Sequence, residues 1–198
     1  MGDVLQFPGA VSNRGYTRAR RSALREDPNQ LSLFAVAPAA EAPLTPFEQA
    51  LLFDEQEDGR AAELYQQAIE NNDSVADAYC NLGILESRLG KTARAFDCFT
   101  RALKQDPRHG TAHYNLAKLY LEANEVRLAQ LHYEMATRVT PTLAAAHFNL
   151  SLVRAQHGDR PGALDAMLAY RELVSDPAEI RQADTVLGAL RTASSETP

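Results

Sequence analysis

Three asparagines recur at one spacing and are the side chains in this sequence best suited to hold a ligand. Asn81, Asn115 and Asn149 lie 34 residues apart, each directly before a leucine. A carboxamide offers a donor and an acceptor, so it can pair with any peptide unit. Helices stacked about 10 Å apart would match about every third residue of an extended chain at roughly 3.3 Å per residue. The pattern predicts an asparagine ladder for a peptide; the alternative is a tolerated polar residue beside the leucine.

No group of residues in the sequence indicates catalysis. It has no glycine-rich phosphate loop, no His-Glu-x-x-His word and no paired cysteine motif. Cys80 and Cys98 are expected on different helices and facing different surfaces, which argues against a disulfide or a metal pair. His113 and His147 share the repeat position of Tyr79, so aromatic packing is favoured over metal binding. We expect a non-enzyme without cofactor or metal.

The elements that must position the asparagines follow the same 34-residue period. Copies of one pattern begin at residues 76, 110 and 144, and each reads as two amphipathic helices. In the first copy, a turn at Gly90-Lys91 separates the helices, and Asp106-Pro107 ends the second. The chain here resembles the tetratricopeptide repeat (TPR) family. The matching residues are Leu82, Gly83, Ala95, Phe99, Ala102 and Pro107 in one copy, and Leu116, Ala117, Tyr120, Ala129, Tyr133, Ala136 and Pro141 in the next.

This resemblance implies the fold and the domain boundaries. It implies an all-α, right-handed TPR solenoid of three to four repeats, because one repeat cannot bury its apolar face alone. Thr45-Pro46-Phe47-Glu48 is a capping box that opens a degenerate first repeat, with Glu48 and Gln49 in place of the usual Leu and Gly. Tyr170 replaces a small residue in the last repeat. The expected segments are a disordered arm (1–44), repeats at 45–75, 76–109, 110–143 and 144–176, a capping helix (177–191) and a tail (192–198).

The resemblance also implies a binding groove. In TPR proteins the first helices line a concave surface, and the asparagine pattern is similar to the ladder of the O-linked N-acetylglucosamine transferases. The groove residues predicted beside the ladder are Tyr114, Phe148, Lys118 and Arg88. The TPR clamp that binds acidic peptide tails needs several basic residues, and this groove has only Lys118 and Arg88. An extended, partly apolar peptide is therefore the better match. The expected function is a protein-interaction adaptor.

Charge and composition argue against nucleic-acid-binding, membrane-spanning and secreted proteins. The 198 residues carry a net charge of −6; residues 1–41 contribute +1 and the remainder −7, which argues against nucleic-acid binding by the repeats. No apolar run approaches the roughly 20 residues of a membrane span, and the N-terminus does not read as a secretory signal. We expect a cytoplasmic protein of a bacterial type that makes no membrane contact.

Two features stand out in the N-terminal arm. The stretch from Arg14 to Arg25 has five arginines and no acid, and reads as a solvated tail or a phosphate contact. Gln30-Leu31-Ser32-Leu33-Phe34 is similar to the word by which polymerases and repair proteins reach the bacterial DNA sliding clamp. The alternative is that this word covers Leu51 and Leu52 as an intramolecular cap. A further alternative, regulation of a transcription factor, would require a separate partner subunit.

Overall fold

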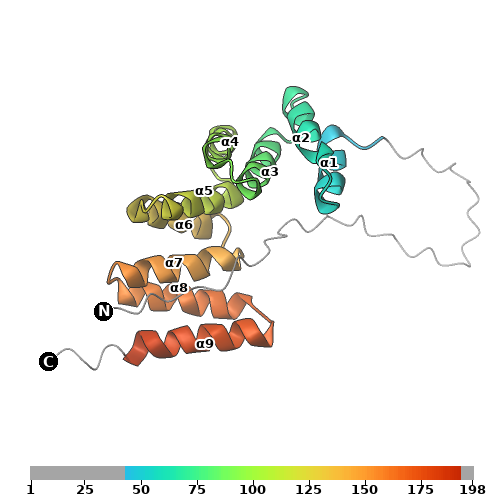
Figure 1. The fold of residues 1–198 in the computed structure, drawn as a ribbon. Coiled ribbons are helices and arrows are strands. Elements are labelled where there is room, and N and C mark those ends of the chain that lie inside the picture. Colours follow the sequence, from blue (N-terminus) through green and yellow to red (C-terminus); the bar gives the residue numbers. More distant parts are fainter. Residues whose placement is uncertain (1–42, 193–198) are drawn as a thin grey trace, which may run out of the picture. The chain divides into compact units, whose positions relative to one another are not determined.

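In the computed structural model, residues 43–192 are described, and this part of the chain contains nine α-helices and no strand (Figure 1). The expected all-α solenoid is confirmed. The helices are α1 (Pro46–Glu55), α2 (Arg60–Glu70), α3 (Val75–Arg88), α4 (Thr92–Gln105), α5 (Gly110–Glu122), α6 (Val126–Val139), α7 (Ala144–Gln156), α8 (Arg160–Leu173) and α9 (Pro177–Thr192). The arginine stretch and the Gln30–Phe34 word lie outside the described residues.

The first helix begins at the capping box that the sequence predicts. The Thr45 hydroxyl oxygen accepts a hydrogen bond from the Glu48 amide at 3.2 Å, and the Thr45 amide donates to the Glu48 carboxylate at 3.0 Å. Pro46 occupies the first helical turn, where its missing N–H removes no intrahelical bond. Two backbone donors at the helix start are therefore satisfied.

Close approach within each helix pair depends on small residues at repeated positions. Ala95 and Ala129 are fully buried, and the aromatic rings of Phe99 and Tyr133 fill the space beside them. A methyl group added at Gly83 would lie 2.7 Å from the Phe99 ring, closer than carbon atoms can pack. Glycine at this position therefore lets α3 and α4 pack against each other.

The register of the first repeat differs from the prediction. Ala50, not Gln49, is the small residue with no exposed surface, and it packs with Tyr65 of α2. The turn that follows is displaced in the same direction. Its positive-φ residue is Glu57, whereas the position 34 residues before Gly90, the positive-φ residue of the next repeat, is residue 56. Since α2 keeps the regular spacing, α1 and its turn are shifted by one residue.

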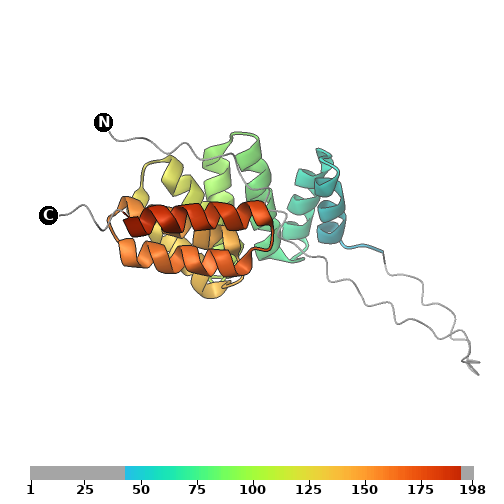
Figure 2. The same cartoon turned by 90° about the horizontal axis from the view of Figure 1, so that it is seen from below.

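The last helix covers the end of the helix stack. Tyr170 and Met167 of α8 form a buried cluster with Ala183 and Leu187 of α9. Figures 1 and 2 both show α8 and α9 lying alongside each other. Tyr170 thus occupies a position where a small residue is usual, and its ring packs against α9.

Neither cysteine faces a surface, contrary to the prediction for this pair. Cys80 is fully buried among Ala95, Phe99 and Leu116, and Cys98 is also buried. Both are free thiols. Within the described residues, none of the helices combines the length and apolar character needed to cross a membrane.

Candidate functional site

The first helices of the pairs, α1, α3, α5 and α7, are linked to one another by polar side chains, and we call the surface they form the first-helix face. Each neighbouring pair of these helices has one such bridge. The bridges are the ion pair of Arg88 with Asp54, the His109 Nε2 contact with Asp77 Oδ1 at 3.1 Å, and the Asn149 amide donating to the Tyr114 hydroxyl at 3.3 Å. The face is therefore held by specific contacts as well as by apolar packing.

The three ladder asparagines lie on this face, but they are less exposed than the sequence suggested. Asn115 is half-buried, and its Nδ2 donates to the Thr111 carbonyl of its own helix at 2.9 Å. Asn149 is half-buried and bound to Tyr114. Asn81 is only 4% exposed. A ladder of three exposed amides is therefore not what the structure contains: packing covers Asn81, Asn115 bonds its own helix, and Asn149 bonds Tyr114 of α5.

Tyr114 and Phe148, predicted as groove contacts, are engaged in packing. Tyr114 is buried, with its ring 5.9 Å from that of Tyr133. Burial raises the pKa of the Tyr114 hydroxyl, and the Asn149 hydrogen bond opposes that rise. Phe148 is half-buried, and its ring centre lies 5.0 Å from that of Tyr170. Both rings therefore pack mainly against neighbouring helices beneath the first-helix face.

Of the two basic residues predicted in the groove, Arg88 is paired with Asp54, and Lys118 lies on α5. Its Nζ lies 5.9 Å from the centre of the Tyr114 ring, within the range of a cation–π interaction. Leu121 on α5 is exposed, and Leu152 on α7 is half-buried. The α5–α7 part of the face thus offers apolar contacts from Leu121 and Leu152, together with the charges of Lys118 and of the exposed Glu122.

A second polar group, which the sequence analysis missed, lies between the first two repeats. We call Asp54, Tyr65, Asn81 and Arg88 the Asp54 cluster. The Tyr65 hydroxyl donates to Asp54 Oδ2 at 3.4 Å, and Arg88 forms its ion pair with the same carboxylate. Burial and the Asp54 charge raise the pKa of Tyr65, and the nearby Asn81 opposes that rise. The signal in the sequence was the separation of Asp54 and Arg88 by one period of 34 residues.

Asn81 has an unusual position within this cluster. Its side chain lies against the Tyr65 hydroxyl, yet its buried Nδ2 has no hydrogen-bond partner of normal geometry in the part of the chain that the structure describes. A buried donor without a partner costs about 1–3 kcal/mol. Of the three ladder amides, Asn81 is therefore the one whose donor lacks a hydrogen bond of normal geometry.

The net charge of the helical region is concentrated in the first repeat. Residues 45–75 contain eight acids and one Arg, a formal charge of −7, whereas residues 76–192 contain 13 acids and 14 bases, a charge of +1. The acidity is therefore a property of the first repeat, and the remaining repeats are balanced.

The nucleophiles and imidazoles of the described residues are placed for packing. Burial raises the pKa of the Cys98 thiol to about 11 and raises that of Cys80 further, which keeps both protonated at neutral pH. The Nδ1 atoms of His113 and His132 lie 3.0 Å apart, and His113 Nε2 lies 3.1 Å from the Pro107 carbonyl oxygen. Within residues 43–192, no three His, Cys, Asp or Glu side chains come together as metal ligands.

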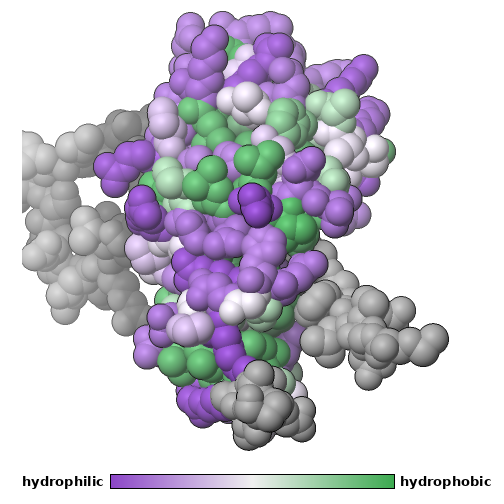
Figure 3. Space-filling view, turned by 90° about the vertical axis from the view of Figure 1, so that its left-hand side faces the viewer, coloured by the Kyte–Doolittle hydropathy of each residue, from purple (hydrophilic) through white to green (hydrophobic). Residues whose placement is uncertain are grey.

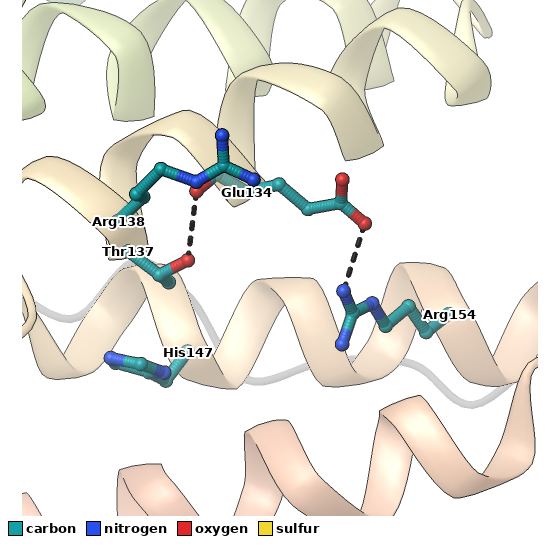
Figure 4. Close-up of a pocket in the computed structure, with 5 residues that line it drawn as sticks. All are labelled: Glu134, Thr137, Arg138, His147 and Arg154. Carbon is teal, nitrogen blue, oxygen red and sulfur yellow. Dashed lines mark hydrogen bonds and ion pairs between the residues drawn. The ribbon is translucent and has the colours of Figure 1, made fainter.

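A shallow pocket of about 220 Å³ lies between α6 and α7 (Figure 4). Arg154 binds Glu134 at 2.9 Å and the Gly162 carbonyl at 3.2 Å, and the Thr137 hydroxyl donates to the Glu134 carbonyl at 3.0 Å. His147 and Arg154 project from the side of α7 opposite to Asn149, as the helical repeat requires. Arg154 thus links α7 to α6 through Glu134 and to α8 through Gly162, on the side of α7 away from Asn149.

Two family models match the middle of the chain. Both describe a tetratricopeptide repeat, one over residues 76–109 and the other over residues 98–130. Among curated proteins, tetratricopeptide repeat protein 8 of Mus musculus is 33% identical over 90 residues, and the human protein O-mannosyl-transferase TMTC3 is 30% identical over 114 residues. These matches cover 46% and 56% of this chain but only 18% and 12% of the relatives, so the chain spans less than a fifth of either protein.

Solved structures share the arrangement of helices. MamA 41-end from Desulfovibrio magneticus RS-1 has a TM-score of 0.59 at 21% identity, covering 75% of this chain and 82% of that one. The first TPR of Spaghetti (RPAP3), bound to an HSP90 peptide, has a TM-score of 0.54 at 20% identity, covering 61% of this chain and 94% of that one. At such identities the likeness concerns the fold. Residues 76–130 therefore match tetratricopeptide repeats, and residues 43–192 form a helical solenoid of the kind that these structures share.

Proposed function

We propose that this chain is a non-enzymatic adaptor that holds an extended peptide segment of a partner protein on its first-helix face. The observation that carries the proposal is the line of amide, apolar and basic side chains along α3, α5 and α7. Asn81, Lys118 and Leu152 give that line a hydrogen-bond donor, a positive charge and an apolar contact. These chemistries suit a backbone with mixed side chains.

The spacing of the first helices supports an extended ligand. Neighbouring helices at about 10 Å match about three residues of a strand-like chain at roughly 3.3 Å per residue. The solved structure of RPAP3 with an HSP90 peptide is an example of the fold with a peptide bound. The corrected geometry gives the three amides unequal roles: Asn81 has a donor to offer, whereas Asn115 and Asn149 would first give up their present partners.

We also propose a reducing, cytoplasmic environment of a bacterial type. Both cysteines are free, and free thiols are usual where glutathione or thioredoxin keeps them reduced.

The proposed peptide site can be tested with a phage-displayed library of random nonapeptides selected on the full chain. The enriched peptides should bind the parent chain, and Leu152→Asp should weaken that binding at least about tenfold, because it places a charge on an apolar contact. Leu128→Asp is the matched control, since Leu128 is exposed on α6, a second helix. A library without enrichment, or equal binding by both variants, would contradict the proposed site.

Attachment to a DNA sliding clamp is a second candidate function. It is favoured by the similarity of Gln30-Leu31-Ser32-Leu33-Phe34 at all five places. A short word of this kind acts independently of the repeats, so both functions could belong to one chain. Partnership with a transcription factor has no comparable observation in its favour.

A further inference from the structure

The first repeat presents an unusual surplus of negative charge beside the proposed groove. Its single base, Arg60, pairs with Asp58, so seven carboxylates remain without a base from the same repeat. The acids of this repeat are Glu48, Asp54, Glu55, Glu57, Asp58, Glu63, Glu70 and Asp73. Such a surface attracts basic segments over a distance of about 10 Å, but charge alone does not define a site.

The amide donor of Asn81 supplies an independent indication of a ligand. Its Nδ2 is buried and makes no hydrogen bond of normal geometry in the described part of the chain, although it interacts with the Tyr65 hydroxyl that bonds Asp54. A carbonyl oxygen entering between α1 and α3 would satisfy it. The backbone of an extended peptide carries such an oxygen at every residue.

A basic side chain of a ligand can replace Arg88 as the partner of Asp54 at low cost in free energy. The Asp54 side chain is 22% exposed, whereas that of Arg88 is 50% exposed. A ligand base that replaces Arg88 on Asp54 returns a half-exposed guanidinium to water and leaves the carboxylate paired. A ligand acid that captured Arg88 would instead leave a largely buried carboxylate without its cation, which is costly. The asymmetry selects a basic ligand side chain.

We propose that the Asp54 cluster is a specificity pocket of the peptide groove: Asp54 accepts an Arg or Lys side chain of the partner segment, and the amide of Asn81 donates to a neighbouring backbone carbonyl. This inference rests on the proposed function. Because Leu121 and Leu152 offer apolar contacts on α5 and α7, the preferred segment carries its base over α1 and α3 and its apolar residues over α5 and α7. At about three extended residues per repeat, the two kinds of side chain should be separated by about three to six residues.

The same nonapeptide library tests this pocket when it is selected in parallel on three full-length proteins. Peptides enriched by the parent should share an Arg or Lys at one position. Selection on Asp54→Asn should remove that preference, whereas selection on Glu70→Gln should retain it. Glu70 is the matched control because it is an exposed acid of the same repeat, so both variants lose one negative charge. Enrichment without a preferred base, or a base preference that Asp54→Asn leaves intact, would overturn the pocket while leaving the peptide groove standing.

Binding of one enriched peptide then measures the individual contacts. Replacing its base by neutral citrulline should weaken binding to the parent about tenfold, the usual effect of a charge-assisted hydrogen bond, and should change binding to Asp54→Asn by less than about twofold. Arg88→Gln should strengthen binding of the basic peptide more than Arg60→Gln does, because only Arg88 competes for Asp54. Equal effects of these two variants would indicate general charge attraction and overturn the pocket. Thermal melts confirm that each variant is folded at the assay temperature.

Discussion

At the scale of single residues, one backbone position in the turn within each repeat controls how the two helices are joined. Gly90, Asn124 and Gly158 recur at the period of the repeat and all have positive φ, between 60° and 77°. Glu57 takes this conformation in the shifted first turn, with φ of 56°. A side chain with a Cβ is disfavoured there, and glycine is not.

Glu57→Gly should stabilise the chain by about 0.5–1 kcal/mol, because relief of the left-handed strain exceeds the entropy that glycine loses on folding. Gly90→Glu is the reciprocal variant and should destabilise it by a similar amount. Urea unfolding of the full chain measures both. A loss of stability in Glu57→Gly would show that the Glu57 side chain stabilises the turn more than its backbone conformation strains it.

Asn81→Leu should also stabilise the chain, by about 1–2 kcal/mol, because it replaces a buried amide, whose Nδ2 makes no hydrogen bond of normal geometry, with an apolar group of equal heavy-atom number. Asn149→Leu should destabilise it by about 0.5–1.5 kcal/mol, since the buried Tyr114 hydroxyl loses its donor. Chemical denaturation of the two variants gives the comparison. Matching losses of stability would mean that the Asn81 amide is satisfied in the folded chain.

At the scale of elements, the sequence predicted the features that residues close together in the chain determine. It missed the features that depend on contacts with another helix. Thr45 and Glu48 are three residues apart, so their capping box was visible in the sequence. The burial of Asn81 depends on Tyr65 of another helix, which the period alone does not show. The shift of α1 was missed for a related reason: a degenerate repeat lacks the Leu-Gly marker that fixes the register elsewhere.

The pair of α5 and α6 should respond to mild acid through His113 and His132. Burial lowers the pKa of both, and that of His132 falls to about 4; for His113, the Pro107 carbonyl and Asp106 oppose the fall and His109 adds to it. The unfolded chain therefore binds protons more readily between pH 6.5 and about 4. Stability is complete above pH 6.5 and should fall by about 1–3 kcal/mol as the pH decreases across this interval.

Urea unfolding at a series of pH values checks this dependence. His132→Phe should flatten it, since phenylalanine keeps an aromatic ring beside Tyr120 but cannot take up a proton. His147→Gln is the control, because His147 bonds the Pro141 carbonyl from the same repeat position as His113. An unchanged pH dependence in His132→Phe would assign the acid sensitivity to other groups.

At the scale of the whole molecule, the proposed binding through the repeats and the proposed binding through the arm can be tested separately. Apolar residues reach the surface of the helical region in patches framed by hydrophilic ones (Figure 3). The Gln30–Phe34 word lies outside the residues that the structure describes, so its role stays a prediction.

A fluorescent peptide spanning residues 27–36 should bind a purified bacterial sliding clamp, because Leu33 and Phe34 can each bury a side chain worth roughly 1.5–3 kcal/mol in an apolar pocket. Changing both residues to Ala should abolish the anisotropy signal. If no binding is seen at tens of micromolar clamp, and removal of residues 1–44 lowers the melting temperature, the word is an intramolecular cap.

The uneven distribution of charge also has a kinetic consequence. With −7 on residues 45–75 and +1 on residues 76–192, the helical region is an electric dipole whose negative pole is its first repeat. In the field of a basic partner such a dipole turns during diffusion, so that collisions are biased toward the first repeat before any contact forms. The rate of association should therefore fall as salt is added, while the rate of dissociation, which depends on short-range contacts, should change far less.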